Sequence, residues 1–313
     1  MALLSVILPA YNEEKMIDKA SSRLAGLLRS ERIDFELIFV DDGSKDDTWI
    51  RIKRQSAQKD YVRGVKFSRN FGKEAAIFAG LAEADGDCVV VMDCDLQHPP
   101  ETVIEMYRLW TEGYEVVEGV KRSRGKEGVG HKASAGLFYK IMSKATGIDM
   151  SRASDFKLLD RRAVEALLEM PERNAFFRAL SSWIGFRTTA VAFDVQDREA
   201  GESKWSTWSL IKYAVTNIAA FSSVPLQMVT VAGAFMFVFA LVMGIESLVK
   251  YFDGQALEGF TTVILLLLII GSLVMMSLGA IGYYISKIYE EVKGRPRYIV
   301  SGIAGKRKIE LYK

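Results

Sequence analysis

Two carboxylates one residue apart, Asp93 and Asp95, follow a run of four apolar residues in the segment VVVMDCDLQHPP. The run is typical of a strand buried on both faces, so the acidic pair lies at the carboxyl end of a central strand. Ligands bind at that edge of open α/β sheets. Asp93, Asp95 and the side-chain carbonyl of Gln97 offer the hard oxygen ligands that suit Mg²⁺ or Mn²⁺ bridging to a phosphate. A solvated turn is the alternative, because Asp is a common turn residue.

Other apolar runs along the chain also end in polar loops. Residues 3–8 lead into PAYNEE and residues 35–40 lead into VDDGSKDD, and a helical pattern follows each loop. A third run, 62–67, leads to a loop at 68–72 and a further helix. Strands that alternate with helices in units of roughly 30 residues predict a mostly parallel sheet with helices on both faces. The polar loops should therefore share one edge of that sheet.

Residue types in the first two loops suit a nucleoside diphosphate. A carboxylate accepts hydrogen bonds from a base N–H or from ribose hydroxyls, and Asp41 or Asp42 fits that task. Capping of the next helix is the alternative, although a cap requires only one of them. The first loop contributes Pro9, Tyr11 and Glu13. There the aromatic ring can stack on a base and the carboxylate can bind ribose, unless the loop is an ordinary helix start.

Cations also stand where phosphates are expected. Arg69 and Lys73 flank a glycine at the start of the third helix, which suits a phosphate, although either could be a surface cation. Farther along, the cluster KRSRGK contains Arg122 and Arg124. A basic loop near the active edge can bind a second phosphate, that of a lipid-linked acceptor, and a solvated loop is the alternative.

The last third of the chain is predicted to enter a membrane. Residues 226–245 and 259–286 contain no Asp, Glu, Lys or Arg, and these stretches of 20 and 28 residues meet the length that a helix needs to cross a bilayer. Residues 205–224 mix small, aromatic and apolar residues as an interfacial helix would, with a buried helix as the alternative. The tail after residue 286 is basic, so the positive-inside rule predicts that the tail and the N-terminal domain are both cytosolic.

Composition excludes other classes of protein. A net charge of +2 over 313 residues is too small to indicate a nucleic-acid partner. The two cysteines, Cys88 and Cys94, have no second pair with which to complete a zinc site, and we interpret them as reduced packing residues.

The loops PAYNEE, VDDGSKDD and MDCDLQHPP, in this order, resemble the nucleotide-sugar-binding half of family 2 glycosyltransferases. Three motifs, SRNFGKE at 68–74, DCDLQ at 93–97 and DFKLLDR at 155–161, resemble in order and spacing the signatures of one group within that family. The similarity is greatest to the polyprenyl-phosphate glycosyltransferases and extends from about Ser5 to Arg297. It implies a Rossmann-like GT-A fold. It also implies that Asp155 lies near the acceptor, as a base or as an orienting group. The alternative is an edge carboxylate paired with an arginine, since Arg161 and Arg162 follow. The resemblance further implies that Asp95 serves catalysis and that acceptor-phosphate arginines occur near residue 122. A second basic stretch then supplies Arg198 and Lys204 as phosphate ligands.

The sequence therefore predicts an α/β GT-A domain over 1–204, an interfacial helix over 205–224, two transmembrane helices within 225–287 (about 226–249 and 259–286), and a basic tail over 288–313. The resemblance implies inverting, metal-dependent transfer of one sugar from a UDP- or GDP-hexose to undecaprenyl or dolichyl phosphate. This would occur at the cytosolic face of the cell (inner) membrane. Another lipid acceptor, or a non-catalytic membrane scaffold, is the alternative. Glycines at 271, 279 and 282 permit close helix packing, which leaves a homo-oligomer open.

Overall fold

The computed structural model describes residues 2–122, 154–172, 176–194, 224–253 and 259–305. It divides into two compact units. The first comprises Met1–Trp205 together with Pro296–Lys313, and the second comprises Ser206–Arg295. The first unit contains the α/β domain, to which the chain returns after the apolar helices.

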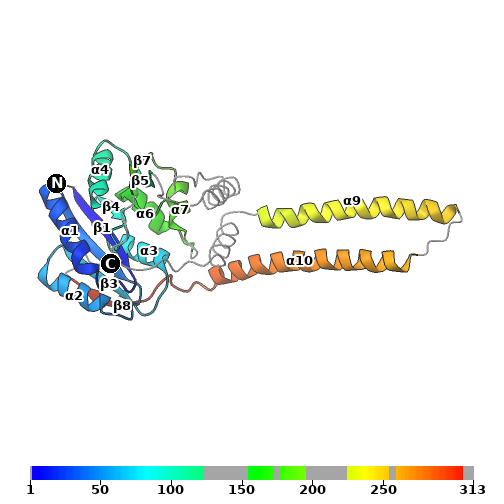
Figure 1. Cartoon of the computed structure of the whole chain (residues 1–313), viewed down its shortest axis with the longest axis horizontal. Helices are drawn as coiled ribbons and strands as arrows, with labels where there is room; N and C mark the ends of the chain where they lie inside the picture. Colours follow the sequence, from blue (N-terminus) through cyan, green and yellow to red (C-terminus); the bar gives the residue numbers. More distant parts are fainter. Residues whose placement is uncertain (1, 123–153, 173–175, 195–223, 254–258, 306–313) are drawn as a thin grey trace. The chain divides into compact units, whose positions relative to one another are not determined.

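The α/β domain is built on one eight-stranded sheet in the order β7-β5-β6-β4-β1-β2-β3-β8 (Figure 1). Six strands are parallel, whereas β6 and β8 run antiparallel to their neighbours. The mostly parallel sheet that the sequence predicts is thus confirmed. The strands are β1 (Leu3–Ala10), β2 (Asp34–Asp41), β3 (Val62–Phe67), β4 (Cys88–Val91), β5 (Val116–Lys121), β6 (Lys157–Asp160), β7 (Thr188–Phe193) and β8 (Val300–Ala304).

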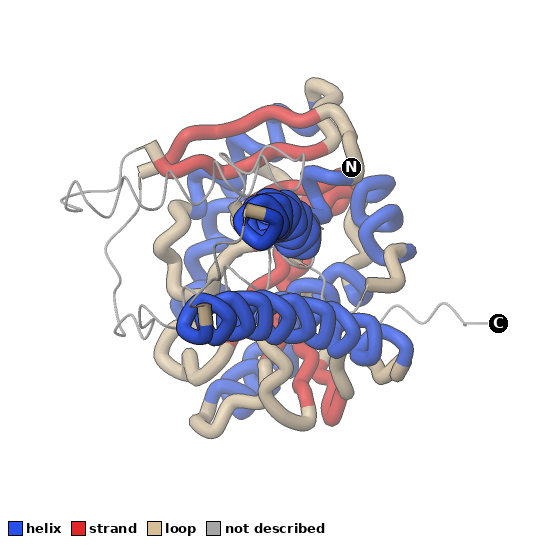
Figure 2. Tube along the Cα trace, turned by 90° about the vertical axis from the view of Figure 1, so that its right-hand side faces the viewer, coloured by secondary structure: helices blue, strands red, loops and turns tan. Residues whose placement is uncertain are grey.

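Helices cover both faces of the sheet, and they flank the strands in the ribbon of Figure 1 and in the tube of Figure 2. One face is covered by α1, α2 and α4, and the other by α3 and α6 with α7 beside them. Central strands are therefore apolar on both sides: Val6 of β1 joins the core under α1, while the adjacent Ile7 packs against Gly80 of α3. The helices are α1 (Ile17–Ser30), α2 (Thr48–Gln58), α3 (Lys73–Glu83), α4 (Pro100–Thr111), α6 (Arg161–Glu169) and α7 (Phe177–Trp183).

Part of the segment predicted as a basic tail forms a strand. Residues 300–304 are β8, which pairs antiparallel with β3 and extends the sheet. The segment is short and holds a glycine, and its partner lies more than 200 residues earlier in the chain. Local sequence patterns carry little information on such distant pairing.

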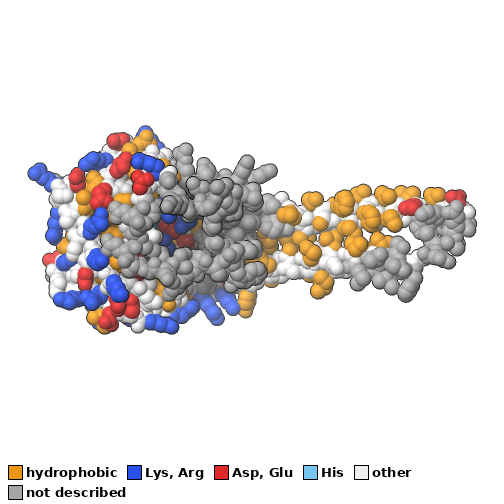
Figure 3. Space-filling view, viewed as in Figure 1, with side chains coloured by type: hydrophobic (Ala, Val, Ile, Leu, Met, Phe, Trp, Pro, Cys, Tyr) orange, Lys and Arg blue, Asp and Glu red, His pale blue; other side chains and the backbone are white. Residues whose placement is uncertain are grey.

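The second unit contains two long apolar helices, α9 (Val224–Phe252) and α10 (Phe260–Val292), which pack against each other. Their candidate membrane spans are Leu226–Glu246 and Ile269–Val292, and the apolar windows of both are unburied within the structure. Figure 3 shows apolar side chains along their surface. Both helices are thus long and apolar enough to cross a membrane. The predicted interfacial helix lies outside the described residues except at its last position.

Candidate active site

The sheet has a topological switch point at its centre. From β1 the chain builds β2 and β3 on one side and then returns to place β4 on the other side. In open α/β sheets a crevice forms outside the carboxyl ends of the two strands at such a point. The loops after β1 and β4, which carry Tyr11 and Asp93, meet this condition. The fold therefore gathers the polar loops that the sequence singles out.

The loop after β1 is tied to the loop after β2 by backbone-to-side-chain hydrogen bonds. Asn12 N donates to Ser44 Oγ at 2.9 Å, Lys45 N donates to Asn12 Oδ1 at 2.9 Å, and Glu13 N donates to Thr48 Oγ1 at 2.8 Å. Tyr11, in the same loop, leaves 43% of its surface exposed. Pro9 precedes it as the penultimate residue of β1. The predicted donor-binding residues Tyr11 and Glu13 thus share one fixed loop, and Pro9 lies in the strand that leads into it, while the Tyr11 side chain is partly open to solvent.

Asp41 and Asp42 have different environments, although the sequence could not separate them. Both oxygens of Asp42 accept from backbone, with Phe71 N at 2.6 Å and Gly72 N at 2.9 Å. Burial raises the pKa of Asp42, and these backbone donors oppose the shift. Asp41 accepts from Ser44 N through Oδ1 at 2.9 Å, while its buried Oδ2 has no hydrogen-bond partner among the described residues. Asp41 therefore has one buried acceptor oxygen, Oδ2, without a partner among the described residues. Asp42, in contrast, uses both of its oxygens to hold the neighbouring loop.

That neighbouring loop, residues 68–72, is called here the Ser68 loop. Arg69 lies over the Phe71 ring, 4.2 Å from its centroid, and Gly72 has a positive φ of 98° just before α3. Gly43 approaches this loop so closely that an added Cβ would collide with the backbone of Arg69 and Asn70. The two loops therefore pack backbone against backbone, and the glycine is required sterically as well as for its φ of 68°.

The acidic loop after β4 has a defined conformation. Asp95 Oδ1 accepts from Gln97 N at 3.1 Å, and Leu96 between them has a φ of 57°, which is uncommon for a residue other than glycine. Asp93 N donates to Nδ1 of the buried His98 at 3.3 Å, and the imidazole stacks on Phe156. Burial lowers the pKa of His98. A neutral His98 therefore holds the backbone of Asp93 in place by accepting its N–H.

Lys73 joins the acidic loop to the segment before β6. Its Nζ lies 2.5 Å from Asp93 Oδ1 and 3.0 Å from Asp155 Oδ2. Burial would raise the pKa of Asp93, but the surrounding charges and hydrogen bonds, with the Lys73 ammonium foremost among them, together lower that pKa below its ordinary value. The two carboxylates in turn raise the pKa of Lys73, against the effect of burial. All three groups are thus charged, and the lysine supplies one positive charge between two anions.

Asp155 is also held by Arg178, a residue that the sequence analysis missed. The guanidinium binds it through Nε to Oδ1 at 2.6 Å and through Nη2 to Oδ2 at 2.7 Å. Burial would raise the pKa of Asp155, but Lys73 and Arg178 together hold that pKa well below its usual range. Arg178 lies on α7, and this helix is anchored to the sheet by the buried Lys157. The Lys157 Nζ donates to Ser181 Oγ of α7 and to Glu118 Oε1 of β5. Asp155 is therefore a fixed anion.

The predicted acceptor residues are only partly described. Arg122 follows β5, at the same edge of the sheet as Asp93, and its side chain is 67% exposed. It lies 3.7 Å from Asp194, which follows β7. Arg124, Arg198 and Lys204 lie outside the described residues. The structure thus places one of the four cations at the expected edge.

The oxygen ligands at this edge of the sheet suit Mg²⁺ or Mn²⁺ only if the substrate supplies further ligands. Among the described residues no three His, Cys, Asp or Glu side chains are grouped as a metal site. The loop offers two carboxylates, Asp93 and Asp95, with the amide oxygen of Gln97 nearby in sequence. Mg²⁺ is commonly held by one or two carboxylates together with substrate phosphates rather than by an all-protein cage. The residues therefore fit a metal ion that arrives with a diphosphate.

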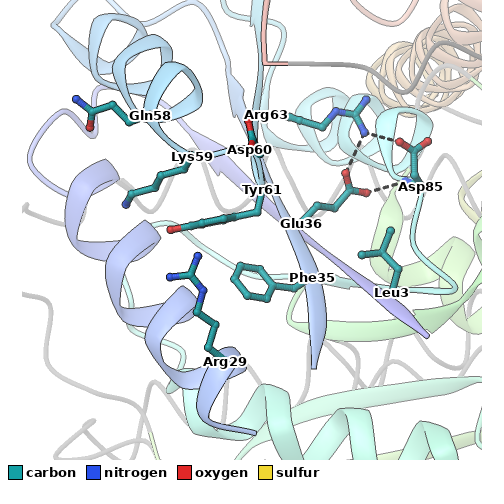
Figure 4. Close-up of a pocket in the computed structure, with 10 residues that line it drawn as sticks. All are labelled: Leu3, Arg29, Phe35, Glu36, Gln58, Lys59, Asp60, Tyr61, Arg63 and Asp85. Atoms are coloured by element: carbon teal, nitrogen blue, oxygen red, sulfur yellow. Dashed lines mark hydrogen bonds and ion pairs between the residues drawn. The ribbon is translucent and has the colours of Figure 1, made fainter. Parts of the chain in front are cut away.

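A cavity of about 790 Å³ lies at the opposite edge, near the amino ends of β1, β2 and β3. Figure 4 shows Arg63 at its wall, paired with Glu36 and Asp85 at 3.0 and 2.8 Å. Arg29 covers the ring of Tyr61, 4.7 Å from its centroid. Because Arg63 is neutralised by Glu36 and Asp85, we interpret these three side chains as a structural brace that joins β2 and β3 to the turn before β4.

Comparison with known proteins identifies the class. The family model for glycosyl transferase family 2 matches residues 5–168. A protein of Bacillus subtilis (strain 168) named Uncharacterized glycosyltransferase YkcC is 38% identical over 311 residues, which cover 99% of this chain and 96% of that protein. The SfII prophage-derived bactoprenol glucosyl transferase of Shigella flexneri is 34% identical over 302 residues, 95% of this chain and 97% of that protein.

Among solved structures, this chain is similar to glucosyl-3-phosphoglycerate synthase from Mycobacterium tuberculosis in complex with Mn²⁺ and UDP-glucose. The identity is 22%, the match covers 70% of this chain and 77% of that one, and the TM-score is 0.49. The sequence matches, by their extent, establish that the protein belongs to glycosyltransferase family 2 and is a glycosyltransferase.

Proposed function

We propose that this enzyme transfers a single sugar from a uridine diphosphate sugar to the phosphate of a polyprenyl phosphate, with inversion at the anomeric carbon. One observation carries the proposal: Asp93, Lys73, Asp155 and Arg178 are linked in a continuous charged chain at the switch point of the sheet. The relatives named bactoprenol glucosyl transferase support the lipid acceptor.

The free acceptor atom of Asp41 favours uridine as the base. Uracil offers a single N–H between two carbonyl groups, which one carboxylate oxygen can accept. Guanine presents two adjacent donors, N1–H and its amino group, which suit both oxygens of a carboxylate. Asp41 Oδ1 already accepts a hydrogen bond from Ser44 N, whereas Oδ2 has no partner among the described residues and is the oxygen that we propose for the base N–H. A buried acceptor without a partner costs free energy, and a base N–H would remove that cost.

Asp93, Asp95 and Gln97 would hold a divalent metal ion in this proposal. When bound, Mg²⁺ or Mn²⁺ would neutralise the charge that develops on the departing diphosphate. Arg69 and Lys73, at the start of α3, are proposed to bind the same diphosphate, since the amino end of a helix favours anions. Tyr11 and Glu13 are proposed to contact the base and the ribose.

Asp155 is proposed to orient the acceptor rather than to take its proton. A phosphate acceptor is already ionised at neutral pH, so a single displacement has little need of a base. The low pKa of Asp155 makes it a weak base, and its two cationic partners fix its position. Arg122, Arg124, Arg198 and Lys204 are proposed to bind the acceptor phosphate. The reaction would then occur at the cytosolic face of the membrane that α9 and α10 span.

The test is an assay of the purified full chain in lipid nanodiscs that contain undecaprenyl phosphate. Each of UDP-glucose, GDP-mannose and other nucleotide sugars is supplied, and the lipid product is weighed by mass spectrometry. We expect undecaprenyl phosphate plus one hexose from a UDP-sugar only. Product on diacylglycerol would mean a different lipid acceptor, and nucleotide binding without consumption of any sugar would mean a non-catalytic scaffold.

Substitution of the acceptor cations refines this test. Arg122→Ala should raise the KM for the lipid or lower turnover, while the affinity for the nucleotide stays at the parent value. Equal weakening of nucleotide binding and lipid use would show that Arg122 serves the donor phosphate instead.

A further inference from the structure

The segment that follows α10 returns to the α/β domain beside the Ser68 loop. Ser68 N donates to Ile299 O at 2.9 Å, directly after the last residue of β3. The β3–β8 ladder changes register between Lys66 and Phe67, next to this bond. This irregularity in the ladder lies where the chain that enters β8 meets the first residue of the Ser68 loop. The loop is thus clamped at its first residue by a strand from the far end of the sequence.

An aromatic row continues from this clamp into the loop. The Tyr298 ring stacks on Phe67, with centroids 4.9 Å apart and planes at 15°. Phe67 in turn meets Phe71 edge to face at 5.7 Å. The adjacent Arg297 covers the Phe78 ring of α3, 4.4 Å from its centroid, and donates to the Met170 carbonyl oxygen. Residues 297–299 therefore brace both the loop and the helix that follows it.

The far end of the row is the part of the loop that faces the candidate active site. Phe71 N and Gly72 N are the donors that satisfy the Asp42 carboxylate. Lys73, the next residue, bridges Asp93 and Asp155. Phe71 itself lies under the Arg69 guanidinium. A shift of the Phe71 ring would therefore move two backbone donors and two cations of the site together.

We infer that Tyr298 is a positioning residue: through Phe67 and Phe71 it holds the Ser68 loop so that Arg69 and Lys73 meet the diphosphate of the donor. The chain thereby completes its donor site with a residue that follows the second apolar helix. The link to the donor rests on the proposed function, whereas the effect on the loop does not depend on it.

The test uses the full chain in nanodiscs with three variants. Tyr298→Ala removes the stacked ring, Tyr298→Phe keeps it, and Ile303→Ala alters an exposed side chain of the following strand β8, opposite Val65. Hydrogen exchange is followed by mass spectrometry on a peptide that covers residues 68–80. We expect Tyr298→Ala to speed exchange at Phe71 and Gly72 by about tenfold, while peptides of β1 and β4 stay protected.

The two controls should exchange at the parent rate. Unchanged exchange in Tyr298→Ala, or equally faster exchange throughout the sheet, would overturn the inference, because Tyr298 would then be inert or a general stabiliser. In the transfer assay Tyr298→Ala should raise the KM for the nucleotide sugar more than the KM for the lipid, with Tyr298→Phe restoring the parent values. If the parent consumes no nucleotide sugar, the proposed function fails, and the exchange experiment still decides the role of Tyr298.

Discussion

Arg178 binds both oxygens of Asp155, at 2.6 and 2.7 Å, and leaves this carboxylate with the geometry of a bidentate ion pair. Lys73 adds a contact to Oδ2 at 3.0 Å. An anion held by two cations loses its affinity for a proton, so its usefulness at neutral pH lies in its charge and position. Of the two roles that the family resemblance implies for Asp155, this arrangement supports the orienting role that we propose over that of a base.

Asp155→Asn keeps the size of the side chain and removes its charge. We expect transfer to fall by about 10², the lower end of the range for general-base assistance, because the acceptor phosphate needs orientation more than deprotonation. Nucleotide affinity, measured by calorimetry, should persist. Transfer within about twofold of the parent, well below that range, would show that Asp155 is structural.

Arg178→Lys tests the Asp155–Arg178 ion pair by changing its cation. A lysine keeps the charge but cannot make the two parallel hydrogen bonds, so we expect a loss of turnover in the same direction as Asp155→Asn. The double variant should lose little more than the worse single variant, because both act through one contact. Fully additive losses in turnover would indicate independent roles.

Removal of the metal ion should abolish transfer if Asp93 and Asp95 share it with the diphosphate. Asp95→Asn should lose several kcal/mol of transition-state stabilisation and weaken the binding of Mn²⁺ in the presence of UDP. Asp60→Asn is the matched control, since this exposed carboxylate lies at the opposite edge of the sheet. Turnover that withstands both a chelator and Asp95→Asn would eliminate the metal mechanism.

Asp41 and Asp42 should respond differently to the same substitution. Asp41→Asn replaces the free acceptor oxygen with a group that can donate, so UDP should bind more weakly while the fold is retained. Asp42→Asn removes an acceptor from Phe71 N or Gly72 N and should lower the melting temperature as well. UDP affinity unchanged by Asp41→Asn would show that this residue does not contact the base.

Much of the fold could be predicted because its signals are local. The apolar run at residues 62–67 coincides with β3, and the acidic pair at 93 and 95 follows β4, which ends at Val91. The parallel topology then brings the strand ends together, so the residues of the polar loops could be assigned to one edge. No comparable local signal marks β8, whose pairing with β3 depends on contacts across most of the chain.

The side-chain partners within the site could not be predicted in the same way. Arg178 lies on a helix of seven residues, 23 positions after Asp155, and nothing in its neighbourhood distinguishes it from a surface arginine. The Asp155 carboxylate is itself a signal that such a partner exists, since a buried anion before a strand requires a cationic partner. Likewise, the different roles of Asp41 and Asp42 depend on the path of the Ser68 loop, which spacing does not encode.

Gly43→Ala should disrupt the contact between the loop after β2 and the Ser68 loop. A Cβ at this position collides with backbone that cannot move independently, and the positive φ adds strain. We expect a lower melting temperature and weaker UDP binding. Gly26→Ala is the matched control, because a Cβ there meets nothing within 4 Å and alanine favours the helix α1. Equal behaviour of the two variants would contradict the proposed close packing.

The pH dependence of stability should carry a contribution from Glu74. This side chain accepts a hydrogen bond from Phe177 N at 2.9 Å, and burial raises its pKa to about 7 from an ordinary value of 4.5. Between these two values the folded state keeps a proton that the unfolded state releases. The free energy of unfolding therefore falls as pH rises from about 4.5 to 7 and is independent of this group above that range.

Glu74→Gln tests this contribution, because the amide keeps an acceptor for Phe177 N and cannot ionise. Melting temperatures of the full chain, measured from pH 5 to pH 8, should decline less in this variant than in the parent. Glu112→Gln, at an exposed position after α4, should follow the parent curve. Parallel curves for Glu74→Gln and the parent would mean that Glu74 ionises at the same pH in the folded and unfolded states, and that its burial against α7 has no electrostatic cost.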